Sequence, residues 1–250
     1  VSGIASAVTN NGKGVASIAY NHAKLLIVKV CGDDYPTYVV KGYEGIVYAV
    51  DHGAKIINCS WGGAYSGFFG QSVINYALSK GCLVVAAAGN NGTNIVDFPA
   101  AYAGVFAVTS VSSYDIKSNY AQYGKEVDIS APGGEDGSKI LSTVFGGGYA
   151  GDYGTSMAAP VVSSAAALVK AAYPELTMQQ VGERLKATAE NIDYLNPNYV
   201  GKIGAGRLDV NNAITSNDPF PSQSNLKFVL QQNYPNPAKG STFIKFTLPN

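Results

Sequence analysis

The stretch whose residue types could do chemistry is Gly154–Pro160, in which a serine lies between small residues. Residues 146–151 before it are rich in glycine, and the apolar run Val161–Ala172 after it predicts a buried helix. A hydroxyl at a helix N-terminus lies at the positive end of the helix dipole, and glycines let a substrate backbone approach closely. Ser156 is therefore a candidate nucleophile. The alternative is that Thr155 or Ser156 only caps the helix, which is the commoner role of such residues.

Two polar turns flanked by glycine follow predicted strands. Ser60–Gly63 comes after the apolar run Ile56–Cys59, and Gly89–Gly92 comes after Leu83–Ala87. In parallel α/β sheets, ligands bind at the carboxyl ends of the strands. The glycines of the first turn could pair with an extended peptide, and the Asn90 amide could donate to a developing oxyanion. Asparagine is also an ordinary turn former, so a simple turn is the alternative for Asn90.

These stretches resemble, in the same order, the motifs of the subtilisin-like serine proteases. The resemblance extends over about residues 1–214 and rests on six segments: Val1–Ala5, Ser60–Gly63, Ala86–Asn90, Asp128–Gly133, Gly154–Pro160 and Gly204–Asp209. It implies an α/β fold of three layers, with a mostly parallel central sheet flanked by helices. Because several ordered segments match, chance similarity is a poor explanation.

The resemblance also implies roles for single residues. Ser156 would form an acyl-enzyme during peptide hydrolysis, and the Asn90 amide with the Ser156 backbone N–H would form the oxyanion hole. The implied substrate-binding residues are Ser60, Trp61, Gly62, Gly63, Ala87, Ala88, Gly89 and Asp97. The expected partners are protein or peptide substrates.

The same mechanism needs a base beside the serine and a carboxylate that orients the base. The chain has two histidines, His22 and His52, and neither lies in a His-Gly-Thr sequence. His52 ends a helical pattern, where a histidine commonly meets terminal carbonyls. In the family, the catalytic histidine would lie just before Val1 and the aspartate further upstream. We therefore expect an N-terminally truncated chain that lacks both partners and is proteolytically silent alone.

Phe98–Ala100 resembles the family segment at the base of the pocket for the residue on the amino side of the scissile bond, here called the cleavage-site residue. The resemblance predicts a cis peptide bond between Phe98 and Pro99. Asp97 falls near the floor of that pocket, where a carboxylate would favour lysine or arginine by charge pairing. The alternative is a surface carboxylate unrelated to the substrate.

The expected reaction requires no cofactor, and one loop suggests a structural metal. Thr9–Gly14 resembles a calcium-binding loop of the family, with Asn11 as a candidate ligand. A plain glycine-rich turn is the alternative, because the other ligands would come from a missing N-terminal part. The three cysteines, Cys31, Cys59 and Cys82, lack Cys-x-x-Cys spacing, so we expect buried free thiols and no zinc or iron site.

Composition and charge bear on which partners the chain could bind. Charged residues are 14% of the chain, below the roughly 25% usual for globular domains, and 17 basic residues balance 17 acidic ones. This balance gives no support for binding to nucleic acid or to a membrane surface. The longest apolar stretch, Met157–Val169, is interrupted by Pro160 and by two serines, so we expect no membrane span.

The elements that must position Ser156 follow from apolar runs separated by helical patterns. This alternation favours a parallel sheet covered on both faces. Predicted strands are 25–30, 56–59, 83–87, 105–108, 127–129 and 139–144; predicted helices are 37–51, 71–80, a helix from Ser156 onward, and 177–188 with Thr177 as N-cap.

Composition changes after Ile214. Residues 215–225 are polar and rich in proline, which predicts a linker between a peptidase domain, 1–214, and a β-rich module, 226–250, with strands at 228–230 and 242–248. Residues 230–237 and 242–246 resemble the start of the C-terminal sorting domain of type IX secretion. The resemblance implies export by that secretion machinery and an extracellular or bacterial cell-surface location.

Two other functions deserve comparison with the protease. A nucleotide-binding domain could use Gly146–Gly148 as a phosphate loop, but no Gly-x-x-x-x-Gly-Lys-Ser/Thr or Gly-x-Gly-x-x-Gly sequence follows the first predicted strand. A catalytically dead peptide-binding or adhesion module would keep the fold and the substrate groove, and it stays open as the second hypothesis.

Overall fold

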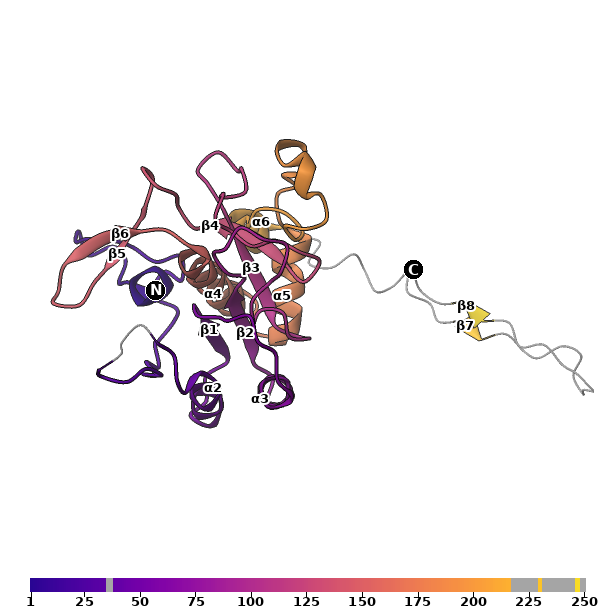
Figure 1. Ribbon diagram of the computed structural model, residues 1–250, viewed down its shortest axis with the longest axis horizontal. Coiled ribbons are helices and arrows are strands. Elements are labelled where there is room, and N and C mark those ends of the chain that lie inside the picture. Colours follow the sequence, from indigo (N-terminus) through magenta and orange to yellow (C-terminus); the bar gives the residue numbers. More distant parts are fainter. Residues whose placement is uncertain (35–37, 217–228, 231–245, 248–250) are drawn as a thin grey trace, which may run out of the picture. The chain divides into compact units, whose positions relative to one another are not determined.

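The computed structural model describes residues 1–34 and 38–216, together with two short strands at 229–230 and 246–247. The chain divides into two compact units, Val1–Ser216 and Asn217–Asn250. The first unit holds a four-stranded sheet with helices on both of its faces (Figure 1). The α/β architecture with a parallel central sheet, expected from the sequence, is confirmed.

The central sheet forms where the chain is continuously apolar. Its strands, in the order β1-β2-β3-β4, are β1 (Ile56–Cys59), β2 (Leu83–Ala87), β3 (Phe106–Val111) and β4 (Ile129–Pro132). All three strand pairs are parallel, and every residue of β2 and β3 is buried. A parallel sheet that is covered on both faces requires this kind of unbroken apolar strand. The carboxyl ends of neighbouring strands therefore share one edge.

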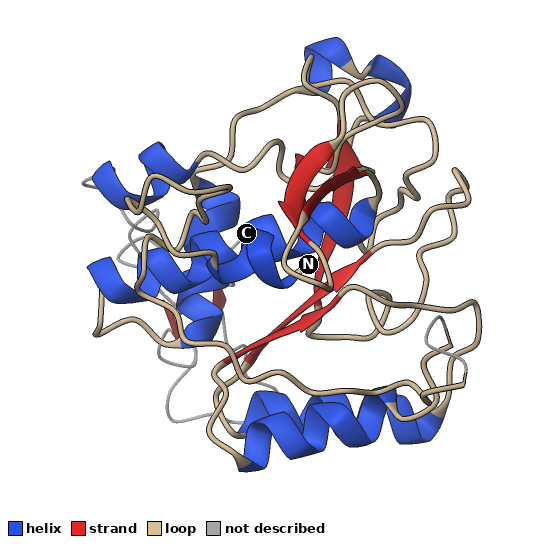
Figure 2. Ribbon diagram, turned by 90° about the vertical axis from the view of Figure 1, so that its left-hand side faces the viewer, coloured by secondary structure: helices blue, strands red, loops and turns tan. Residues whose placement is uncertain are grey.

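Helices cover the sheet from two sides. They are α1 (Ser2–Ser6), α2 (Gly42–Asp51), α3 (Phe68–Ser79), α4 (Thr155–Ala172), α5 (Met178–Ala187) and α6 (Val210–Thr215), with 3₁₀ turns η1 (Asp193–Leu195) and η2 (Pro197–Tyr199). α2 and α3 pack against each other, and α4 packs against all four strands. Helices lie on both sides of the strands in Figure 2.

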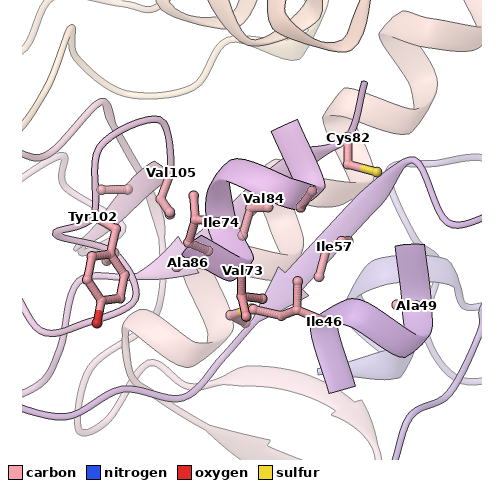
Figure 3. Packing of buried hydrophobic residues seen from close by; sticks show 14 of the residues in the cluster. Ile46, Ala49, Ile57, Val73, Ile74, Cys82, Val84, Ala86, Tyr102 and Val105 are labelled. Carbon is pink, nitrogen blue, oxygen red and sulfur yellow. The ribbon is translucent and has the colours of Figure 1, made fainter. Parts of the chain in front are cut away.

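The main core lies between the sheet and the α2–α3 pair (Figure 3). Alternate residues of β2, Val84 and Ala86, belong to this core together with Ile46 of α2 and Ile74 of α3. Side chains alternate between the faces of a strand, so Val85 and its alternate neighbours point toward the α4 face. The sheet is thus fixed from both sides, which holds the ends of β1 and β2 in place.

α4 is the helix expected from Ser156 onward, and it is uninterrupted. It starts at Thr155 and runs through Pro160 and the two serines that were expected to break the apolar run. Its 18 residues are long and apolar enough to cross a membrane, but 61% of the helix is buried inside the protein. The Ser163 hydroxyl donates a hydrogen bond to Asn58 Oδ1, and the Ser164 hydroxyl accepts one from the Ala19 N–H. This is the environment of a core helix.

The prediction of a buried strand at residues 25–30 is wrong. This segment forms no strand, and Leu25, Leu26 and Ile27 are 47%, 43% and 67% exposed. The backbone of a strand needs a neighbouring strand to pair with. In the described part of the chain none adjoins this segment, and a cavity of about 770 Å³ lined by residues 22–28 and 56–61 lies beside it.

Three smaller expectations also change. The helix predicted from residue 37 starts at Gly42. The glycine run belongs to a hairpin of β5 (Ile140–Thr143) and β6 (Tyr149–Asp152), of which only the first strand was expected. Cys31 is only partly buried, whereas Cys59 and Cys82 are buried free thiols as predicted.

In the second unit, β7 (Val229–Leu230) pairs with β8 (Phe246–Thr247) in antiparallel fashion. Both fall within the strands predicted for a β-rich module. The predicted linker from residue 217 onward and the sorting-domain sequence at 231–237 lie outside the described residues.

The N-terminus of α5 gives a test of the fold. Thr177 accepts a hydrogen bond from the Gln180 N–H, and the Gln180 side chain accepts one from the Thr177 N–H, which completes the predicted cap. Replacing Thr177 with alanine should lower the free energy of unfolding by about 1 kcal/mol, because a helix N–H loses its acceptor. Urea unfolding followed by circular dichroism measures the change. Gln179→Ala, in the same turn and exposed, should leave stability nearly unchanged.

Candidate active site

The candidate nucleophile lies where the N-terminus of α4 meets the end of β1. Ser156 Oγ donates to the Ser60 carbonyl oxygen over 3.3 Å, and Ser60 Oγ donates to the Ser156 carbonyl oxygen over 2.8 Å. The two residues are 96 positions apart in the sequence. The structure therefore brings together the first turn and the serine motif that the sequence singled out.

Pro160 explains why the Ser156 carbonyl is available to Ser60. In a helix this carbonyl would accept from the N–H of the residue four positions later, which here is a proline without an N–H. Ser60 Oγ supplies the missing donor. The proline in α4 thus creates an acceptor that ties the substrate segment to the helix.

A chain of hydrogen bonds holds the Ser60 hydroxyl in position. Asn58 Nδ2 donates to Ser60 Oγ over 2.9 Å, and Asn58 Oδ1 accepts from Ser163 Oγ of α4 over 3.0 Å. Sequence reasoning missed the positioning roles of Asn58 and Ser163. A signal was present, because Asn58 is a polar residue within an apolar strand, and an amide drawn into the protein interior needs partners.

Asn90 is anchored to α4 by its side-chain oxygen. Asn90 Oδ1 accepts from both the Thr155 N–H and Thr155 Oγ1, each over 2.9 Å. The Asn90 Nδ2 group donates to no described group, and neither does the Ser156 backbone N–H. The amide donor of Asn90 and the main-chain donor of Ser156 are therefore both available beside the serine hydroxyl.

The capping interpretation of the serine motif does not hold. The N-cap of α4 is Gly154, and no side chain caps the helix. Thr155 is fully buried, and its Oγ1 donates to Asn90 while accepting from the Gly89 N–H over 3.2 Å. Thr155 thus holds the second turn to the helix instead of closing the helix end.

Two glycines allow this close assembly. Gly89 has φ of 115°, and a Cβ there would lie 1.6 Å from Gln122 Oε1. Gly154 has φ of 150°, and a Cβ there would come within 3.4 Å of Asn90 Nδ2. Residues that carry a side chain rarely adopt such φ values. At Gly154 a side chain would also fill the space in front of the Asn90 amide donor.

The remaining predicted substrate residues form two facing segments. Gly63 exchanges backbone hydrogen bonds with Phe98, and the Phe98–Pro99 peptide bond is cis, as predicted. Trp61 packs against α2, with its ring centroid 5.5 Å from that of Tyr43.

In the other segment Ala87, Ala88 and Gly89 follow one another at the carboxyl end of β2, where both alanines are buried. The Asp97 N–H donates to the Ala88 carbonyl oxygen over 2.9 Å, which places Asp97 between the two segments.

A second set of contacts supports the glycine before the helix. The Gly154 N–H donates to the Gly133 carbonyl oxygen over 2.9 Å. Tyr120 packs against Tyr153, and its hydroxyl donates to the Gly134 carbonyl oxygen over 2.6 Å. Burial raises the pKa of Tyr120, so its hydroxyl stays a donor at neutral pH.

Neither histidine serves as a base for Ser156 in the described structure. His52 follows the last residue of α2, where a ring nitrogen lies 2.8 Å from the Tyr48 carbonyl oxygen, as predicted, and the ring stacks on Tyr48. No hydrogen bond joins Ser156 to His22 or His52 across the described residues. Burial raises the pKa of the neighbouring Cys59 thiol to about 12, so this cysteine is no rival nucleophile.

The candidate calcium loop does not fit a cation well. Asn11 Oδ1 already accepts a hydrogen bond from the Lys13 N–H over 3.0 Å, as in a plain turn. The loop itself carries no carboxylate, the ligand type that calcium favours. Nor do the described residues group three or more histidine, cysteine, aspartate or glutamate side chains that could hold a metal.

A family model for subtilases matches residues 1–217. Thermitase of Thermoactinomyces vulgaris is 43% identical over 167 residues, which are 67% of this chain and 58% of thermitase. A thermophilic serine proteinase of Bacillus sp. (strain AK1) is 37% identical over 215 residues, or 86% of this chain and 51% of that protein. The chain therefore spans only about half the length of these relatives.

Solved structures show the same similarity. A protease from Pseudoalteromonas arctica matches with a TM-score of 0.76 and 34% identity, covering 85% of this chain and 68% of that one. The patellamide maturation protease PatA matches with a TM-score of 0.74 and 31% identity, covering 85% of this chain and 81% of that one.

Thr155 provides a test of the site's construction. Replacing Thr155 with valine keeps the shape but leaves the partly buried Gly89 N–H without an acceptor, so we expect a loss of about 1–3 kcal/mol in the free energy of unfolding. Thr155→Ser keeps the hydroxyl and should lose much less. Denaturant unfolding of both variants measures the difference, and equal stability of the two would contradict the role assigned to the hydroxyl.

Proposed function

Because this chain belongs to the subtilase family, we propose that it carries the nucleophile and oxyanion hole of a secreted serine endopeptidase. One observation supports this function above others. The unpaired donors Asn90 Nδ2 and the Ser156 N–H lie beside a serine hydroxyl at a helix N-terminus. Such donors stabilise the negative charge that develops on a carbonyl oxygen under attack.

The reaction starts with an extended peptide between Ser60–Gly63 and Ala87–Gly89, paired through its main chain. Ser156 Oγ attacks the scissile carbonyl carbon as its proton passes to a base, and the carbonyl electron pair moves onto the oxygen. Asn90 and the Ser156 N–H donate to that oxygen. The C–N bond then breaks, the amine leaves with a proton from the base, and water releases the acyl group from Ser156 by the reverse sequence.

The base and its orienting carboxylate would come from residues outside these 250. The cavity of about 770 Å³ beside the open edge of β1 supports this proposal, because its lining includes Ser60 and Trp61, next to Ser156. A segment paired with β1 there would end close to the serine. Without a base, serine acylation loses about a million-fold in rate.

We predict that purified residues 1–250 do not hydrolyse peptides. The measurement is release of a chromogenic or fluorogenic leaving group at high enzyme concentration, with Ser156→Ala as the control. Both proteins should give the same background rate. A rate that exceeds the Ser156→Ala background would show that a base is present and overturn this part of the proposal.

In the full-length protein, Asn90→Leu should lower kcat by about 100- to 1,000-fold with little change in KM, because the lost donor acts mainly in the transition state. Asn91→Leu changes the next, exposed residue and should keep kcat near that of the unmodified protein. Steady-state kinetics on a peptide anilide measures both variants. Similar kcat values for the two would exclude Asn90 from the oxyanion hole.

A second candidate function is a catalytically dead peptide-binding or adhesion module. It is favoured by one observation, namely that neither histidine contacts Ser156 in the described part of the chain. The full-length sequence separates the two functions. Asp-x-Gly and His-Gly-Thr motifs upstream of Ser156 support the protease, and replacement of the aspartate or the histidine supports binding alone.

Export is a further part of the proposal. It rests on the likeness of residues 230–237 and 242–246 to a type IX sorting domain. Fractionation of cells that produce the full-length protein should place it outside the cytoplasm, in the medium or at the cell surface. Removal of residues 226–250 together with any later part of that domain should then keep it inside.

A further inference from the structure

We propose that Asp97 makes the substrate site selective for lysine or arginine as the cleavage-site residue. This inference rests on the proposed protease function and names its substrate class. The family and the relatives assign no such preference to this chain.

Backbone hydrogen bonds tie Asp97 and its neighbour Phe98 to both substrate segments. The Asp97 N–H donates to the Ala88 carbonyl oxygen over 2.9 Å, and the next residue, Phe98, exchanges hydrogen bonds of 2.8 and 2.9 Å with Gly63. One segment is thus tied to Asp97 itself and the other to its neighbour. A surface loop unrelated to the substrate would have no such ties to both segments.

The side chain of Asp97 points toward the glycines of these segments. A Cβ added at Gly62 would lie 3.1 Å from Asp97 Cβ and 3.7 Å from Oδ2. A Cβ added at Gly89 would lie 2.6 Å from the same Oδ2. The carboxylate therefore occupies the place toward which side chains at these two positions would project, and only the absence of those side chains leaves room beside it.

Gln122 orients the carboxylate. Its side chain is 1% exposed, and its Nε2 donates to Asp97 Oδ1 over 3.2 Å and also to the Ile95 carbonyl oxygen. Its own N–H donates to the Gly89 carbonyl oxygen over 3.0 Å. Gln122 is a positioning residue, because it ties one carboxylate oxygen to the loop that carries Asn90 and leaves the other oxygen toward the glycines.

The second oxygen has no cation of its own. No described lysine, arginine or histidine forms an ion pair with Asp97, and no hydrogen bond reaches its Oδ2. A partly buried carboxylate with an unused oxygen is best satisfied by a charged donor. A long cleavage-site side chain that ends in an ammonium or guanidinium group supplies that donor, whereas an acidic side chain would be repelled.

The test measures binding, so it does not depend on the missing base. Peptides of the form acetyl-Ala-Ala-Pro-X, with X as lysine, norleucine or glutamate, are titrated into residues 1–250. Trp61 is the single tryptophan of the chain and lies in the substrate segment, so its fluorescence reports binding. We expect the lysine peptide to bind about 10-fold more tightly than the norleucine peptide, as one charge-assisted hydrogen bond allows. The glutamate peptide should bind most weakly.

Two variants of equal charge locate the effect. Asp97→Asn keeps an oxygen that can accept from Gln122, so it should fold, bind norleucine as before and lose the preference for lysine. Asp136→Asn removes an exposed carboxylate elsewhere and should keep the preference. Equal affinity for lysine and norleucine, or a preference that survives Asp97→Asn, would overturn the inference and leave the protease function standing. Failure of every peptide to bind would overturn the inference together with the proposed substrate groove.

Discussion

The pair of hydrogen bonds from Thr155 to Asn90 Oδ1 is the contact on which the site depends. An amide carries an acceptor at one end and donors at the other, so fixing the oxygen also fixes the direction of the NH₂ group. The first N–H groups of a helix lack partners within the helix, and one of them is used here to hold the amide. The same helix end therefore orients Asn90 and leaves the Ser156 N–H free beside it.

This contact can form only because α4 is buried at the centre of the fold. The helix packs against all four strands, so its N-terminus cannot move independently of the ends of β1 and β2. Pro160 adds a specific tie, since the carbonyl that it leaves unpaired accepts from Ser60. A residue that would weaken an ordinary helix interior here couples Ser156, the candidate nucleophile, to the candidate substrate segment.

The sequence predicted those features that are determined locally. Unbroken apolar runs identified the parallel strands, and the serine motif identified the start of α4. Both signals lie within one short segment of the sequence. Gln122 and Asn58 were missed because their importance comes from partners far along the chain, such as Asp97 and Ser163. The segment 25–30 was mispredicted for the same reason: hydrophobicity favours a strand, but only an adjacent strand completes one.

The state of the Ser156 hydroxyl follows from the same network. Its hydrogen bond to the Ser60 carbonyl is 3.3 Å long, near the upper limit for such a bond, while the bond that Ser60 Oγ donates in return is 2.8 Å. The short bond holds the two segments together, and the long one only occupies the proton of the Ser156 hydroxyl. A base that approached Ser156 Oγ would therefore replace a weak acceptor without disturbing the contact that positions the serine. The contacts of Ser60 thus position Ser156 while leaving its hydroxyl in only a long hydrogen bond.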